Sequence, residues 1–307
     1  MVDPVPVYNF PELVAFRLLG ESFSPYSIKI AGRAVYEYIH EALCTNDTDK
    51  PALCISDQLL GPKTHVRQKI DKLFDVRPKT LGKEYNFSSN SKIRIGPDGS
   101  ELPYAEPWHL LDVLGLVLQE IEPWISPKAE IEEGCQIEGN VRIEAGARIM
   151  AGTRLKGNIY IGENAFLGND VLVRGTTSLA AGCAVGYAAE IKSSLVMESA
   201  SIGPASAVID SILGPGCIFG GSVRTMNTNP NGDPISFKAS DAVIKTNRQH
   251  LGAVIGEGAI LASGVLVSPG RNVAPNSFVG PGVVIMKNIP SGTRVVLRQD
   301  LDVSPVN

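Results

Sequence analysis

Residues 143–171 read IEAGARIMAGTRLKGNIYIGENAFLGNDV and carry an aliphatic residue at every sixth position. A helix repeats its apolar residues every three to four positions and a strand every two, so neither explains a period of six. The same spacing extends well beyond this stretch in both directions. Its members are Ile125, Ile131, Ile137, Ile143, Ile149, Leu155, Ile161, Leu167, Val173, Leu179, Val185 and Ile191.

The residues between these aliphatic positions also repeat. Four residues after each aliphatic position lies a mostly small or β-branched residue, as at Ala147 and Thr153, and the residue before that is often Gly or Asn. Gly and Asn tolerate the positive φ of tight corners. The pattern predicts short strands joined by corners, with three strands closing an 18-residue triangular coil. Stacked coils, about 4.8 Å apart, form a parallel β-helix of hexapeptide repeats.

The period slips by one residue after Ile191, breaks for about thirty residues, and resumes at Ile255. The interrupting segment, residues 224–250, reads RTMNTNPNGDPISFKASDAVIKTNRQH and is polar and rich in turn-forming residues. A long insertion in a regular solenoid is usually a protruding loop, and such loops tend to carry function. We therefore expect a protruding loop over about 223–250.

The first 120 residues lack the repeat. Residues 33–43 (RAVYEYIHEAL) and 106–122 (EPWHLLDVLGLVLQEIE) have the broad apolar face of helices, and 92–104 (KIRIGPDGSELPY) indicates a hairpin around 97–99. The sequence thus predicts a mainly β protein with three parts. These are a small α/β domain over 1–122, the β-helix over 123–290, and a C-terminal tail over 291–307.

Composition narrows the functional classes. Hydrophobic residues make up 44% and charged residues 20%, and the net charge is −4. This balance predicts no general attraction to nucleic acid or to an anionic membrane. No long uncharged apolar run predicts a membrane span, and the N-terminus lacks the pattern of a signal peptide. Five widely spaced cysteines fit a reducing cytoplasm better than a disulfide framework. The sequence shows no cluster of metal ligands.

One basic column stands out. Lys156, Arg174 and Lys192 follow one another at intervals of one full coil, so we expect them one above another on one side of the prism. Like charges about 4.8 Å apart repel by roughly 1–3 kcal/mol at an effective dielectric of 20–80. A bound anion would relieve this repulsion. Neighbouring carboxylates such as Glu163 and Glu190 offer the alternative, a solvated face without a ligand.

His250 is the histidine best placed for a functional role. It lies where the protruding loop rejoins the coils, whereas the other three histidines belong to the N-terminal part and fit structural or solvated positions. No arrangement of nucleophile, base and orienting acid can be assembled from the sequence.

Four segments carry a resemblance to a known family. They are RGTTS from Arg174, EIKSSLVME over 190–198, DSILGPGCIFGGSVRTMN over 210–227 and LGAVIGEGAILASGVLVSPG over 251–270. They resemble the acetyltransferase half of the bifunctional glucosamine-1-phosphate acetyltransferase/UDP-N-acetylglucosamine pyrophosphorylases, above all the archaeal-type enzymes. The resemblance covers the chain from Trp108 onward. It implies a left-handed coil, a cytoplasmic homotrimer, and acetyl-CoA as cosubstrate with no metal at the β-helix site.

The resemblance also assigns residues. The sugar-phosphate arginine of the family matches Arg174, its lysine matches Lys192, and an asparagine at the loop entrance matches Asn227. The histidine that acts there as general base falls at Pro204, which cannot accept a proton. The nearby tyrosine and active-site asparagine fall at Ala207 and Ile218.

The N-terminal part resembles the same family's nucleotidyltransferase domain more faintly. The similar segments are SPYSIKIAGRAVYEYIHEAL over 24–43 and AEPWHLLDV over 105–113. The family's glycine-rich triphosphate loop is absent, its lysine falls near Pro25, and the domain is about half the expected length. We therefore expect a degenerate domain without nucleotidyl transfer.

Two functional hypotheses remain. The first is an acyl-CoA-dependent transferase of the UDP-N-acetylglucosamine-pathway type, acting on a sugar phosphate or nucleotide sugar, with His250 as the base. The alternative is a non-catalytic trimer that binds sugar phosphate in a regulatory or scaffolding role. A purely structural solenoid fits the basic column less well.

Overall fold

A computed structural model describes residues 107–119, 121–239 and 242–304, together with four two-residue strands nearer the N-terminus. These strands are β1 (Lys29–Ile30), β2 (Arg33–Ala34), β3 (Ile93–Arg94) and β4 (Glu101–Leu102). They form two antiparallel pairs, β1 with β2 and β3 with β4.

The N-terminal expectations meet these strands at two places. The hairpin around 97–99 is confirmed, since Ile93 pairs with Leu102. The helix expected over 33–43 is wrong at its start, because Arg33 and Ala34 belong to a strand. Ile30 pairs with Arg33, and Lys29 pairs with Ala34. The rest of that segment, and most of the domain expected over 1–122, lies outside the described residues.

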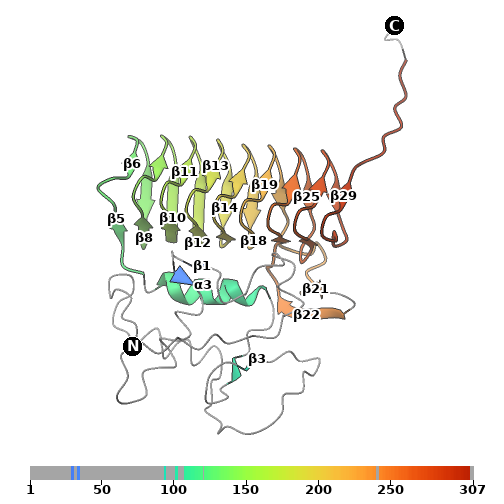
Figure 1. Ribbon diagram of the computed structural model, residues 1–307, viewed down its shortest axis with the longest axis horizontal. Coiled ribbons are helices and arrows are strands. Elements are labelled where there is room, and N and C mark those ends of the chain that lie inside the picture. Colours follow the sequence, from blue (N-terminus) through green and yellow to red (C-terminus); the bar gives the residue numbers. More distant parts are fainter. Residues whose placement is uncertain are drawn as a thin grey trace, which may run out of the picture.

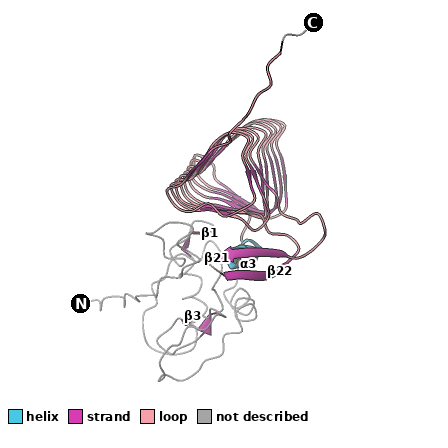
Figure 2. Ribbon diagram, turned by 90° about the vertical axis from the view of Figure 1, so that its right-hand side faces the viewer, coloured by secondary structure: helices cyan, strands magenta, loops and turns pink. Residues whose placement is uncertain are grey.

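The β-helix is confirmed as a left-handed parallel solenoid with three sides (Figures 1 and 2). The first side has strands β7 (Gln136–Glu138), the first half of β10 (Arg154–Ile161), the first half of β12 (Leu172–Leu179), β14 (Glu190–Lys192), β17 (Ala207–Ile209), β20 (Arg224–Thr225), β25 (Leu266–Val267) and β28 (Val284–Ile285). The second side has β5 (Trp124–Ile125), β8 (Val141–Ile143), the second halves of β10 and β12, β15 (Leu195–Val196), β18 (Ile212–Leu213), β23 (Val254–Ile255) and β26 (Asn272–Val273). The third side has β6 (Glu130–Ile131), β9 (Arg148–Ile149), β11 (Phe166–Leu167), β13 (Ala184–Val185), β16 (Ser201–Ile202), β19 (Ile218–Phe219), β24 (Ile260–Leu261), β27 (Phe278–Val279) and β29 (Arg294–Val295).

The aliphatic positions of the six-residue period form the interior of the prism. From Ile143 to Ile191 they are fully or almost fully buried in one continuous core. Ile125 and Ile137 belong to the same period but remain exposed. They lie in the first coils of the solenoid, on which no earlier coil of the described residues stacks (Figure 1).

Two irregularities of the period have structural counterparts. The slip after Ile191 is a shortened coil, since Ser178 pairs with Leu195 where the regular spacing would pair it with Val196. The interruption is an insertion between two stacked strands, because Leu213 pairs directly with Ile255. The coil continues to Thr225, which is buried, so the loop begins at residue 226 and not at about 223. Within the loop lies the antiparallel hairpin of β21 (Ile235–Ala239) and β22 (Ala242–Arg248).

Helix α3 (His109–Gln119) confirms the helix expected over 106–122 and leads into β5. Its buried residues are spaced along one face, and the helix lies against β10, β12 and β15. The β21–β22 hairpin lies beside it (Figure 2). From β10 to β26 the outward residues of the second side are buried under this cover. They are Tyr160, Ser178, Leu195, Ile212, Val254 and Asn272. Among the described residues, no helix has the length and apolarity to span a membrane.

Candidate functional site

The basic column has the register that the spacing of one coil predicts. Lys156 pairs with Arg174, and Arg174 pairs with Lys192. Each cation also has an acidic partner. Lys156 Nζ lies 3.1 Å from a Glu138 oxygen, Arg174 Nε 2.7 Å from Glu190, and Lys192 Nζ 3.1 Å from Asp210.

These acidic partners change the electrostatic argument for an anion. Carboxylates of the chain itself relieve the mutual repulsion of the three cations. Glu190 plays the part that the alternative of a solvated face without a ligand gave it. Arg174 nevertheless keeps donors for a ligand. It uses Nε for Glu190, and its two Nη groups donate no hydrogen bond within the described part of the chain. A guanidinium has five N–H donors, so an anion can bind Arg174 without displacing Glu190.

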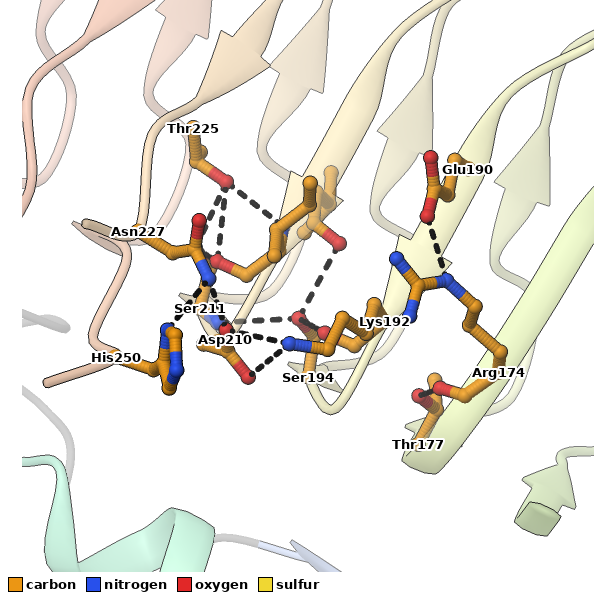
Figure 3. Close-up of polar contacts among 12 residues, drawn as sticks. Arg174, Thr177, Glu190, Lys192, Ser194, Asp210, Ser211, Thr225, Asn227 and His250 are labelled. Atoms are coloured by element: carbon orange, nitrogen blue, oxygen red, sulfur yellow. Dashed lines mark hydrogen bonds and ion pairs between the residues drawn. The ribbon is translucent and has the colours of Figure 1, made fainter.

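Asp210 is the centre of a second polar group, at the corner between the first and second sides. Its residue is 9% exposed, and its backbone has a positive φ of 46°. Asp210 Oδ2 accepts hydrogen bonds from Lys192 Nζ at 3.1 Å and from Asn227 Nδ2 at 2.6 Å (Figure 3). A buried carboxylate is stable only with such partners, so the three side chains form one unit.

The loop brings His250 to the same corner. The Leu251 N–H donates to the Asn227 carbonyl at 3.0 Å, which closes the base of the insertion. His250 Nδ1 lies 3.5 Å from Asn227 Nδ2 (Figure 3). The structure therefore brings together Lys192, Asn227 and His250 of the expected site. Arg174 lies one coil away on the same side.

The contacts of this group favour one tautomer of a neutral His250. A carboxylate only accepts hydrogen bonds, so the Asn227 atom that faces Asp210 is the amide nitrogen. That nitrogen lies 3.5 Å from His250 Nδ1, at the outer limit of a hydrogen bond, and can donate to Nδ1 only when the ring proton is on Nε2.

Asp210 is the member that sequence reasoning missed. The regular spacing places Asp210 one full coil after Lys192, so the sequence carried a signal. The shortened coil pairs Lys192 with Ile209 instead and moves Asp210 onto the corner. Pro204 lies away from this group, in the exposed turn before β17, whereas Asp210 follows the other end of that strand.

The interior thiols are chemically separate from this corner. Burial raises the pKa of the Cys183 thiol to about 12, and burial also raises the pKa of Cys217. Both side chains lie in the core of the prism. A thiol whose pKa is raised holds little thiolate at neutral pH, so neither cysteine has the character of a nucleophile.

Comparisons with known proteins agree with the fold. Residues 155–265, which include all four expected site residues, match the model of the GMPPB C-terminal domain. The chain is 34% identical over 128 residues to an uncharacterized acetyltransferase, YaiX, of Escherichia coli O6:K15:H31, covering 42% of this chain and 55% of that one. It is 35% identical over 85 residues to the bifunctional protein GlmU of Methanococcus vannielii, covering 28% of this chain and 20% of GlmU.

The chain thus spans about half the length of YaiX and a fifth of GlmU. Among solved structures, the polySia-specific acetyltransferase NeuO has 16% sequence identity and a TM-score of 0.35, over 55% of this chain and 82% of NeuO. The resemblance seen in the sequence is confirmed at the level of the domain. The chain carries a left-handed β-helix, and its residues 155–265 match the GMPPB C-terminal domain.

Proposed function

We propose that this chain is an acyl-CoA-dependent transferase that acts on an amino-sugar phosphate or a nucleotide sugar. The observation that carries the proposal is the convergence of Lys192, Asp210, Asn227 and His250 at one corner of the prism (Figure 3). This group lies within the segment that matches the family model, and the partly matching relatives include acetyltransferases.

The residues divide into two roles. The Nη groups of Arg174, which donate no hydrogen bond among the described residues, suit the phosphate of the substrate, because a guanidinium binds phosphate through paired N–H donors. Lys192 lies one coil further, Asn227 reaches the same corner from the start of the loop after β20, and both suit the polar groups of the sugar. Asp210 holds both side chains in place through its Oδ2. No nucleotidyl transfer is part of this proposal.

His250 is proposed to handle the proton. The substrate nitrogen attacks the thioester carbonyl, the carbon–sulfur bond breaks, and coenzyme A leaves as its thiolate. The proton lost by the nitrogen goes to a base, which contributes about 10²–10⁴-fold. In the tautomer described above the acceptor atom is Nδ1, so Asn227 must release Nδ1 before the amine can transfer its proton there. Asn227 is then both a substrate contact and the residue that sets the direction of proton transfer.

The substrate-binding half of the proposal is tested by thermal unfolding with glucosamine 1-phosphate. The double variant Arg174→Ala with Lys192→Ala should lose the stabilisation that the sugar phosphate gives the wild type. Lys156→Ala is the matched control, because Lys156 belongs to the same basic column and is paired with Glu138. It should keep the full shift. An unchanged shift in the double variant would mean that the column is only a solvated face.

A second candidate function is sugar-phosphate binding without turnover. Pro204 favours it, because the family's base falls at this position and proline cannot accept a proton. The contact from Asn227 also favours it, because it occupies the acceptor atom of His250. Under this function the wild type transfers no acyl group. Pro204→His combined with Ala207→Tyr and Ile218→Asn should then create transfer activity, and no gain would count against this second candidate.

A further inference from the structure

Helix α3 and the loop that carries His250 are joined by an ion pair. Arg248 Nη2 donates to Asp112 Oδ1 across 136 positions of sequence. Arg248 is the last residue of β22, and Asp112 lies in the first turn of α3. The two side chains are 26% and 31% exposed, so solvent screens the pair only in part.

An apolar contact joins the same two elements. Trp108 and Phe237 are buried, and their rings meet edge to face with centroids 5.0 Å apart. β21 also rests directly on the prism. A Cβ on Gly270 would lie 2.6 Å from the Ser236 carbonyl oxygen, so only glycine leaves room for the strand there. The hairpin therefore contacts both the start of α3 and the coils, and its far strand leads to His250.

Only Gln249 separates Arg248 from His250. The Arg248 N–H donates to Thr246 Oγ1 at 3.1 Å, and Thr246 Oγ1 donates to the Ile235 carbonyl at 2.6 Å. These bonds fix the end of β22 against β21. His250 itself is exposed, and within the described part of the chain its side chain has one polar contact, Asn227 at 3.5 Å. The position of the His250 ring therefore depends on the backbone that Arg248 anchors.

We infer that Asp112 and Arg248 are a positioning pair for His250, through which helix α3 holds the candidate base at the corner. The inference rests on the proposed function for its effect on turnover. The geometric part stands without it. Neither residue contacts the Lys192–Asp210–Asn227 group in the described structure, so the pair acts through the loop and not on the substrate. A displacement of a catalytic group by about 1 Å costs as much as 10²-fold in rate.

A purely structural role for the pair predicts a different result. A partly exposed ion pair contributes little to folding, so removing it should leave the melting temperature nearly unchanged. A positioning role predicts that the same change loosens residues 243–250 and lowers kcat, whereas a purely structural role predicts no change in kcat. Asp112→Asn in the full chain separates the two, because it keeps the shape of the side chain and removes its charge.

The test measures amide hydrogen exchange and acetyl transfer in the same variant. Asp112→Asn should speed exchange over residues 243–250 and lower kcat about tenfold, with KM for glucosamine 1-phosphate within about twofold. Exchange at β14 and β17 should not change. Glu130→Gln is the control, because Glu130 pairs with Arg148 on the exposed third side, far from the hairpin. It should leave exchange over 243–250 and kcat unaltered.

A charge swap distinguishes loss of the ion pair from a general disturbance of the fold. Asp112→Arg with Arg248→Asp should restore exchange and kcat toward wild type, whereas each single change should not. Unchanged exchange over 243–250 in Asp112→Asn would overturn the inference, as would a fall in kcat with no change in exchange. If the wild type transfers no acetyl group, the proposed function fails, while the exchange data still decide whether the pair holds the loop.

Discussion

Asp210 places a negative charge beside the two residues best suited to hold a substrate. Its carboxylate engages Lys192 at 3.1 Å and Asn227 at 2.6 Å. A phosphate that approached Lys192 would meet this carboxylate and be repelled. The charge therefore favours a neutral sugar hydroxyl or an amine at Lys192 and leaves the phosphate to Arg174.

This arrangement predicts the effect of removing the charge. Asp210→Asn keeps the size of the side chain and frees the Lys192 ammonium, so affinity for inorganic phosphate should rise by about tenfold. Isothermal calorimetry measures this directly. Glu138→Gln is the control, because it removes the carboxylate beside Lys156, at the other end of the basic column, and leaves Lys192 paired with Asp210. Equal affinities in Asp210→Asn and the wild type would show that Lys192 is not screened by Asp210.

Residue-level prediction from the sequence succeeded where spacing alone decides position. The column of Lys156, Arg174 and Lys192 follows from the length of one coil, and the structure has it. Glu138 follows from the same spacing, since it lies one coil before Lys156 and pairs with it. The contact of Asp210 with Lys192 did not follow, because the shortened coil moves Asp210 onto a corner. The closeness of His250 to Asn227 depends on how the loop closes, and the hydrogen bond from Leu251 that closes it leaves no sequence pattern.

At the scale of the elements, the corners limit which residues the coils accept. Gly157 has a φ of 132°, and a Cβ there would lie 2.3 Å from the Gly175 carbonyl oxygen. Gly216 also has a positive φ, of 60°, but a Cβ there would meet no atom within 4 Å. The two glycines therefore separate a crowded corner from an open one.

Alanine at these two corners should have unequal effects. Gly216→Ala adds only the cost of the left-handed backbone, about 1 kcal/mol. Gly157→Ala adds a clash with backbone to a conformation that suits only glycine, so it should lower the free energy of unfolding by more than about 2 kcal/mol. Urea denaturation of both variants tests this. Equal losses would mean that the stacked coils shift apart readily at Gly157.

The elements also show why a local pattern has a limited range. The six-residue period located the strands because each coil repeats the same local arrangement. It could not place α3, whose apolar face is compatible with many partners. The helix covers the second side because Tyr160, Leu195, Ile212 and Val254 gather there from four separate coils, a surface that forms only when the prism closes. The strand at Arg33–Ala34 escaped prediction for a related reason, since the helical spacing over 33–43 carries no sign of its pairing with β1.

For the whole molecule, the cover over the second side bears on how copies of the chain associate. The apolar outward residues of the second side are buried by α3 and the hairpin of the same chain, so this side is not available to another subunit. The third side remains open. Ile218, Ile260 and Phe278 form a register-paired column there and are 45%, 38% and 36% exposed. Such a column is unusual on a surface without a partner.

We therefore predict a homotrimer whose contacts include this column on the third side. Multi-angle light scattering at micromolar concentration should give three times the chain mass. Ile260→Glu should shift the protein toward monomer, because it buries a charge in the contact. Val303→Glu, on the exposed C-terminal tail, should leave the trimer intact. A stable monomer in the wild type would exclude any site shared between subunits.

The central claim, that the corner at Asp210 is the site of an acyl transfer, is tested most directly by one measurement. Transfer of a labelled acetyl group from acetyl-CoA to glucosamine 1-phosphate and related amino-sugar phosphates is followed for the wild type and for His250→Ala. We predict turnover by the wild type and a loss of about 10²-fold in His250→Ala, with affinity for coenzyme A unchanged. Full turnover in His250→Ala, or no transfer by the wild type to any of these acceptors, would contradict the claim.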